Sequence, residues 1–146
     1  MRGIRETRIF FAERLPLAEY LARYRIADLF LDTSPYNAGT TASDALWAGL
    51  PVITFLGETF SARMGGSLLN AIGLPELVCH SQNEYEDLAI DLGKNREKLE
   101  EMKERLAKNR LTMPLFDTTF FTRNLEAAYE KAYERYQNDL PPNHIY

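Results

Sequence analysis

The chain alternates between short apolar runs and longer segments in which apolar residues recur every three or four positions. A short apolar run is typical of a buried strand, and the longer spacing is typical of one face of a helix. The predicted strands lie at residues 8–11, 29–31, 52–55 and 77–79. The predicted helices lie at about 16–26, 40–48, 60–72, 83–93 and 96–110, followed by a long last helix that begins at Asp117 or Thr118. Because strands and helices alternate, we predict an α/β fold with a small parallel sheet of about four strands, flanked by helices and ending in long C-terminal helices.

Composition and charge are those of an ordinary globular protein. Of the 146 residues, 45% are apolar and 26% are charged, and the formal net charge is −4. An acidic chain without a basic stripe is not typical of a nucleic-acid-binding protein. No apolar run is long enough to cross a bilayer, and no signal-peptide pattern opens the chain. Cys79 is the single cysteine, which excludes an internal disulfide, so we expect a cytoplasmic protein that binds neither nucleic acid nor membranes.

Residues 32–49 are the stretch in which we expect the function to lie. They follow a predicted strand, contain loop-forming residues as far as Gly39, and then continue with helix-favouring residues. The predicted geometry is a strand, a loop of small residues and the N-terminus of a helix, with Thr40 or Thr41 as the capping residue. Asp44 lies one turn further along this helix.

A helix N-terminus in this setting favours anions. Its first turn offers unpaired backbone N–H groups and roughly half a positive charge. Gly39 lets a ligand approach the backbone, and Thr40 and Thr41 add hydroxyl donors. The Asp44 carboxylate can accept hydrogen bonds from sugar hydroxyls beside a bound phosphate. The alternative is a capped helix after a tight loop, with no ligand, because the stretch is neither a P-loop nor a dinucleotide-binding fingerprint.

Tyr20 and Arg23 form a second candidate group. They are three positions apart in the predicted helix 16–26 and therefore share one face. Ligands of α/β units bind outside the carboxyl ends of the strands, and the loop before this helix follows one such end. An aromatic ring with a guanidinium beside it can stack a nucleobase, which contributes about 1–3 kcal/mol. The alternative is that Tyr20 packs in the core and Arg23 is a surface charge.

Several separate motifs occur together in one order along nearly the whole chain. They comprise residues 8–11, 15–28, 31–33, Asn37, Thr40, Thr41, Asp44, 46–49, 57–60, Arg63, 73–77, Glu84, Tyr85 and 114–117. In this order they resemble the C-terminal part of the catalytic region of bacterial O-GlcNAc transferase/SPINDLY-like glycosyltransferases. The resemblance is specific, because it rests on many short motifs and not on a single one.

The resemblance implies a GT-B glycosyltransferase, which has two Rossmann-like domains and binds its donor nucleotide mainly in the second. Residues 1–116 would be a Rossmann-like half-domain that binds a nucleotide-sugar, and residues 117–146 a C-terminal helix and tail that pack on it or on a partner. The family product is a sugar, typically N-acetylglucosamine (GlcNAc), on a serine or threonine hydroxyl of an acceptor protein. Helix amides would stabilise the leaving diphosphate without a metal.

The resemblance also assigns a role to each candidate residue. By analogy, Thr40 and Thr41 hold the diphosphate of a UDP-sugar, with the backbone of Gly39 beside them. Asp44 contacts the ribose region. Tyr20 occupies the position of a base-stacking residue, and Arg23 lies beside the uracil. The donor, UDP-GlcNAc, is a substrate, and we expect no cofactor and no metal.

The chain departs from the family pattern at three points. Glycine stands at position 39 and tyrosine at position 20, where the family commonly has histidine. The chain also resembles only the later part of the second domain, so it lacks the acceptor-binding domain, the helical repeats and a basic residue that contacts the diphosphate. His80 and His144 match no catalytic histidine of the family, and we assign no catalytic residue. Residues 1–5 resemble the middle of a domain, so we expect that a longer chain has been truncated.

Two functions therefore stay open. The first is the donor-binding portion of a protein O-glycosyltransferase, inactive as an isolated chain. The second is a diverged module of the same fold that binds or interacts but does not transfer sugar. An unrelated phosphosugar-binding α/β domain is a more remote alternative, which a preference for a sugar phosphate over UDP would reveal.

The last predicted helix raises a separate question about partners. In complete GT-B enzymes the terminal helix commonly crosses to the other domain, so its apolar stripe lacks full cover here. We predict self-association through residues 117–138, and packing on the chain's own sheet is the alternative. The stripe consists of Phe121, Leu125, Tyr129, Tyr133 and Tyr136.

Overall fold

The computed structural model describes residues 5–145. The expectation of a truncated chain rests on residues 1–5, of which residues 1–4 lie outside the described range. The sheet in this part of the chain has three parallel strands in sequence order. They are β1 (Phe30–Leu31), β2 (Val52–Phe55) and β3 (Val78–Cys79). Phe30 lies opposite Val52, and Thr54 lies opposite Val78, so β2 is the central strand.

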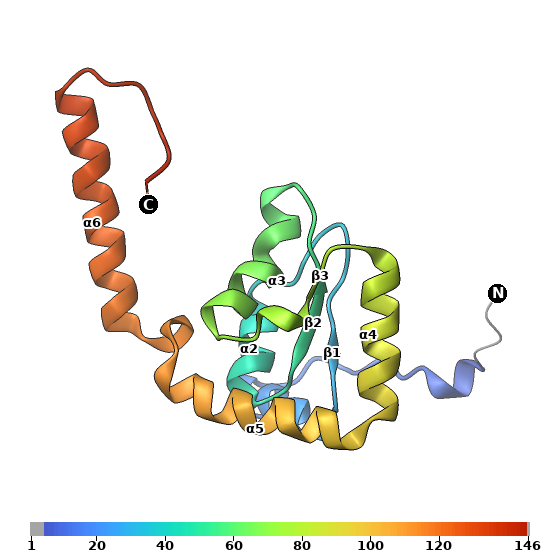
Figure 1. Cartoon of the computed structure of the whole chain (residues 1–146). Helices are drawn as coiled ribbons and strands as arrows, with labels where there is room; N and C mark the ends of the chain where they lie inside the picture. Colours follow the sequence, from blue (N-terminus) through green and yellow to red (C-terminus); the bar gives the residue numbers. More distant parts are fainter. Residues whose placement is uncertain (1–4, 146) are drawn as a thin grey trace.

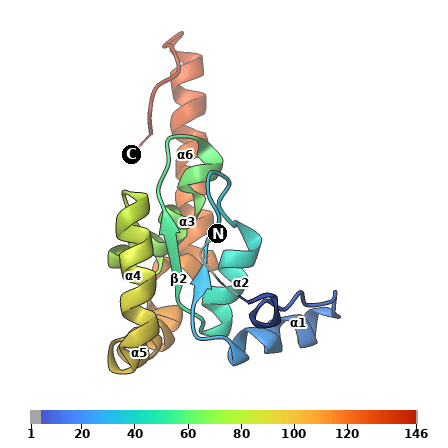
Figure 2. The same cartoon turned by 90° about the vertical axis from the view of Figure 1, so that its right-hand side faces the viewer.

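Helices surround this small sheet (Figure 1). They are α1 (Leu17–Arg23), α2 (Thr40–Ala48), α3 (Phe60–Ala71), α4 (Gln82–Lys94) and α5 (Arg96–Thr112), and a last helix, α6 (Thr118–Gln137), follows them in the chain. Short 3-10 turns lie at η1 (Glu6–Arg8), η2 (Tyr24–Ile26), η3 (Pro75–Leu77) and η4 (Pro114–Phe116). α2 and α3 cover one face of the sheet and α4 covers the other, while α1 lies beside α2 (Figures 1 and 2). The α/β fold with a parallel sheet is therefore confirmed.

The strand predicted at residues 8–11 is wrong, and the sheet has one strand fewer than expected. Arg8 belongs to η1, and the side chains of Phe10 and Phe11 are 87% and 95% exposed. Within residues 5–145, no strand pairs with this segment. An apolar run becomes a strand only when a neighbouring strand completes its backbone hydrogen bonds, and here none does.

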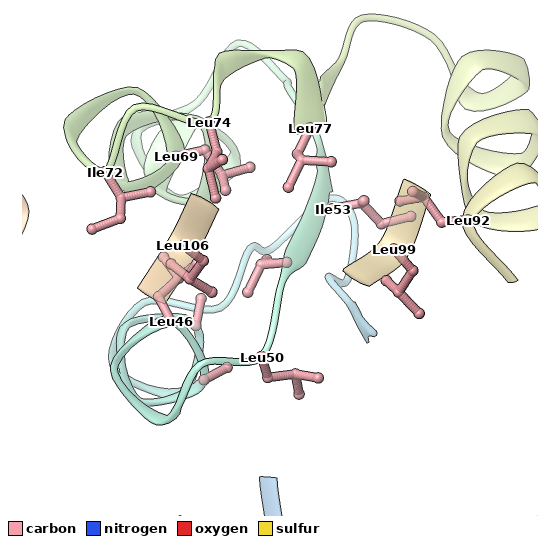
Figure 3. Close-up of a cluster of buried hydrophobic side chains, with 13 residues drawn as sticks. Leu46, Leu50, Ile53, Leu69, Ile72, Leu74, Leu77, Leu92, Leu99 and Leu106 are labelled. Atoms are coloured by element: carbon pink, nitrogen blue, oxygen red, sulfur yellow. The ribbon is translucent and has the colours of Figure 1, made fainter. Parts of the chain in front are cut away.

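The core lies between the central strand and the helices on both sides of it (Figure 3). Val52 and Ile53 of β2 are fully buried, as expected for a parallel strand that is covered on both faces. Leu99 and Leu106 bring α5 into the same cluster. The other large side chains of the cluster are Leu46, Leu50, Leu69, Ile72, Leu74, Leu77 and Leu92.

α3 approaches the strands closely through Gly65. A Cβ atom on Gly65 would lie 2.5 Å from Asp32 Oδ2 and 2.5 Å from Thr54 Oγ1. These two side chains lie at the carboxyl ends of β1 and β2. The glycine therefore allows the helix to lie against the edge of the sheet at which the candidate site begins.

α6 extends away from the sheet and from the helices that cover it (Figure 1). Its apolar stripe is exposed, with Phe121 at 63% and Tyr133 at 64%. The tail folds back along the last turns, where the Arg135 guanidinium donates to the Pro141 carbonyl. The stripe thus does not pack on the chain's own sheet. In residues 5–145, no helix combines the length and the apolar character needed to span a membrane.

Candidate functional site

A buried carboxylate fixes the loop between β1 and α2. Asp32, only 6% exposed, lies directly after β1. Its Oδ1 atom accepts hydrogen bonds from the N–H groups of Thr33 and Ala38 at 2.8 and 2.7 Å, and its Oδ2 atom accepts one from the Thr54 hydroxyl at 2.6 Å. These three bonds satisfy a charge that would be costly to bury alone. They tie both ends of the loop to the end of the sheet.

A second buried side chain supports the same loop. Asn37, only 1% exposed, donates from Nδ2 to the Thr33 carbonyl at 2.9 Å and to the Phe55 carbonyl at 3.5 Å. The Thr33 hydroxyl donates to the Tyr36 carbonyl at 2.6 Å. Because the loop is held by its own side chains, the start of α2 has a defined position over the sheet.

The N-terminus of α2 carries no side-chain cap, and the predicted cap at Thr40 or Thr41 is therefore wrong. Gly39 is the N-cap residue, because the Ser43 N–H already donates to its carbonyl at 3.0 Å and α2 begins at Thr40. Glycine has no side chain to accept from the first turn, and that turn contains no acidic residue. The side chains of Thr40 and Thr41 are exposed. This end of α2 thus has backbone N–H groups without a side-chain acceptor, beside two exposed threonine side chains.

Tyr20 and Arg23 lie together, as their spacing predicts. The Arg23 guanidinium lies 5.8 Å from the centre of the Tyr20 ring and donates to the Glu13 carbonyl at 2.9 Å. A cleft of about 510 Å³ opens between this pair and the preceding segment, residues 12–17. An aromatic ring and a guanidinium at the wall of a cleft are suited to a planar, polar ligand.

Asp44 is linked to this pair through Tyr24. It is half-buried, and its negative charge acts on the hydroxyl of Tyr24. Burial is the main reason why the pKa of Tyr24 is raised, with the hydrogen bond to Tyr20 and the charge of Asp44 adding to it. The structure therefore brings Tyr20, Arg23, Thr41 and Asp44 around one residue, Tyr24.

Two residues of this arrangement were not identified from the sequence. Tyr24 has the spacing of an apolar-face residue, four positions after Tyr20 on the same side of the predicted helix, and this spacing does not indicate a role for its hydroxyl. Asp32 is the first residue of the stretch 32–49, and the sequence pattern gives it no separate role. A carboxylate directly after a buried strand was the available signal for its anchoring role.

Comparisons with known proteins agree over most of the chain. Residues 1–125 match the sequence profile of glycosyl transferase family 41. The chain is 38% identical over 145 residues to the Arabidopsis thaliana protein named Probable UDP-N-acetylglucosamine--peptide N-acetylglucosaminyltransferase SEC, a match that covers 99% of the chain and 15% of that relative. It is 33% identical over 144 residues to the Caenorhabditis elegans UDP-N-acetylglucosamine--peptide N-acetylglucosaminyltransferase, covering 99% of the chain and 12% of the relative.

A solved structure gives the same result. A mutant O-GlcNAc transferase of Thermobaculum terrenum superimposes with a TM-score of 0.84 at 38% identity, over 89% of this chain and 25% of that one. The chain thus spans only 15% and 12% of the length of the two relatives. The resemblance inferred from the motifs is confirmed: the chain corresponds to the C-terminal part of a GT-B catalytic region of the O-GlcNAc transferase/SPINDLY type, and it belongs to glycosyl transferase family 41.

Proposed function

We propose that this chain is the donor-binding portion of a protein O-glycosyltransferase and that it binds UDP-GlcNAc. The observation that carries the proposal is the uncapped N-terminus of α2, whose first turn is linked through the Tyr24 hydroxyl to the Tyr20 and Arg23 side chains at the wall of a cleft. The names of the plant and worm relatives supply the donor class, since both are UDP-N-acetylglucosamine–peptide transferases. In the complete enzyme, the acceptor is a serine or threonine of a protein.

The proposed roles follow the order of the groups along the site. The N–H groups of the first turn of α2 and the hydroxyls of Thr40 and Thr41 bind the diphosphate, which approaches closely at Gly39. Asp44 accepts from the ribose region, and the Tyr20 ring stacks on the uracil with Arg23 beside it. Donors that are fixed before the reaction stabilise the charge that develops on the leaving diphosphate, so this site needs no metal.

Titration of UDP into the chain, followed by calorimetry, tests the proposal. We expect saturable binding that weakens by at least about tenfold when Thr40 and Thr41 are both replaced by valine, because two hydrogen bonds to a charged ligand are lost. Thr119→Val on the exposed α6 is the matched control. A preference for GlcNAc-1-phosphate over UDP would instead favour a phosphosugar-binding domain.

The second candidate function, a diverged non-catalytic module of the same fold, rests on the glycine at position 39, where the family commonly has histidine. A Cβ atom at this position would meet only the Met64 side chain, at an ordinary 3.6 Å, so there is room for the family's histidine. If the chain binds no UDP at millimolar concentration while Gly39→His binds it, the glycine accounts for the loss. Transfer of GlcNAc to a peptide by the isolated chain would contradict our proposal that it is inactive alone.

We also propose that the exposed stripe of α6 mediates self-association, and that the protein is cytoplasmic. The stripe is a continuous apolar surface of the kind that associates with partners. Sedimentation over a range of concentrations tests the self-association, and the double variant Tyr129→Glu with Tyr133→Glu should shift the chain towards the monomer. A wild-type chain that stays monomeric at high concentration would contradict it.

A further inference from the structure

Tyr24 lies at the point where the two halves of the proposed donor site meet. It begins η2, directly after α1. Its hydroxyl lies 2.5 Å from the Tyr20 hydroxyl and donates to the Thr41 carbonyl at 3.3 Å. The Tyr20 and Tyr24 rings meet edge-on, with their centres 5.2 Å apart. One side chain thus contacts both the proposed base-stacking residue and the first turn of α2.

The hydrogen bonds can be assigned a direction. A phenol has one proton, so when Tyr24 donates to the Thr41 carbonyl, it must accept the proton of Tyr20. Burial raises the pKa of Tyr24, so this hydroxyl remains a donor throughout the neutral range. Asp44, which raises the pKa further, and Arg23, which lowers it, are the other charged groups acting on it. The result is a directed chain from Tyr20 through Tyr24 to Thr41.

This chain depends on the tyrosine at position 20. The two hydroxyls meet because a tyrosine carries its polar atom at the tip of the ring, so the Tyr20 side chain cannot swing to another position without breaking the contact. The Thr41 carbonyl belongs to the same turn whose N–H groups and hydroxyls are proposed to hold the diphosphate. Fixing the ring therefore also fixes its distance from the phosphate-binding groups.

We infer that Tyr24 is a positioning residue of the donor site, which sets the Tyr20 ring and the first turn of α2 at the spacing that joins nucleobase to diphosphate. The inference rests on the proposed function. It adds a residue that touches no ligand and acts through its two neighbours. A ligand that spans both halves of the site should depend on Tyr24, and a ligand that occupies only the α2 half should not.

The test compares UDP with pyrophosphate in wild type and in Tyr24→Phe, which keeps the ring and removes the hydroxyl. We expect UDP affinity to fall about three- to tenfold, the effect of one lost hydrogen bond, and pyrophosphate affinity to change less than about twofold. Tyr20→Phe should cause the same loss. The double variant should lose no more than either single variant, because all three break the same chain. Tyr133→Phe on α6 is the matched control.

The outcomes separate this inference from the proposed function. If wild type binds UDP more tightly than pyrophosphate and Tyr24→Phe leaves the ratio of the two affinities unchanged, the inference is overturned while the proposed function stands. A purely structural role would give this result, with only a lower midpoint of thermal unfolding. If wild type binds neither ligand, or binds UDP no more tightly than pyrophosphate, the proposed function fails and the inference fails with it.

Discussion

α2 and α3 both begin at the carboxyl edge of the sheet and cover the same face, yet their N-termini differ. The N-cap of α3 is Thr59, whose hydroxyl accepts the Ala62 N–H at 3.2 Å. The N-cap of α2 is Gly39, which offers no side chain. A helix that is capped by its own residue has fewer donors left for a ligand. The comparison shows why α2, and not α3, is the candidate for binding the diphosphate.

The two helices also differ in how closely they are packed. At Gly65 of α3 an added Cβ would overlap two polar side chains, whereas at Gly39 it would make only an ordinary contact with Met64. α3 is therefore held by direct packing on the strands. The start of α2 is open, and its position depends on the loop that Asp32 anchors. An open group of donors on a fixed support is the arrangement that a binding site needs.

The largest effect should come from filling the packed position. Gly65→Ala places a methyl group 2.5 Å from Asp32 Oδ2 and Thr54 Oγ1, so we expect the free energy of unfolding to fall by about 3 kcal/mol. Urea unfolding measures this. Gly93→Ala is the matched control, because nothing lies within 4 Å of that position in α4 and alanine favours helix, so it should stabilise by about 0.5–1 kcal/mol. Equal effects at the two glycines would contradict the packing argument.

Some of the elements compared above could be predicted from the sequence, and others could not. β2 at Val52–Phe55 coincides with the predicted range, and α2 at Thr40–Ala48 ends where predicted but begins after Gly39 and not after a capping threonine. A central parallel strand is a continuous apolar run between turn residues, and that pattern is local. Residues 8–11 show the same local pattern without being a strand, because pairing depends on a neighbour that the pattern does not specify.

The site residues show the same limit. Small residues before a helix indicated an N-terminus, but the N-cap is decided by which carbonyl accepts the first helical hydrogen bond, and that is Gly39. Tyr24 has the spacing of a core residue. Its hydroxyl gained a role only because α1 and α2, which are separate in sequence, lie side by side.

A side-chain cap added to the open N-terminus of α2 should weaken ligand binding while leaving the free energy of unfolding almost unchanged. We expect Gly39→Asp to weaken UDP and pyrophosphate binding by more than about tenfold, because its carboxylate competes for the N–H groups of α2 and repels the diphosphate. The free energy of unfolding should change by only a few tenths of a kcal/mol. Gly39→Ala, which adds the Cβ without the charge, should retain most of the affinity in calorimetry. Undiminished binding by the aspartate variant would argue against α2 as the diphosphate site.

A change at the capped N-terminus of α3 should lower stability without weakening UDP binding. Thr59→Ala leaves the Ala62 N–H without its acceptor, so we expect the free energy of unfolding to fall by about 1 kcal/mol while UDP affinity is unchanged. Thr40→Ala, at the first residue of the uncapped α2, should alter stability by less than about 0.5 kcal/mol. Urea unfolding and calorimetry on the same preparations compare the two. The distinction between the helices fails if both variants lose the same stability.

The smallest effect concerns Tyr85 of α4, which supports the anchored loop from the other face of the sheet. Its hydroxyl donates to the Asp32 carbonyl at 2.8 Å, and burial, with the charge of Asp32 adding, raises its pKa to about 12. An unfolded tyrosine ionises near pH 10, so the unfolded chain loses this proton first. The stabilisation is therefore complete below about pH 10 and is lost as the pH rises towards 12. Because the hydroxyl is partly exposed, solvent reduces the size of the effect. In unfolding experiments across this range, the free energy of unfolding of Tyr85→Phe should fall less steeply with pH than that of wild type or Tyr133→Phe. An equally steep fall would show that the Tyr85 hydroxyl does not stabilise the loop.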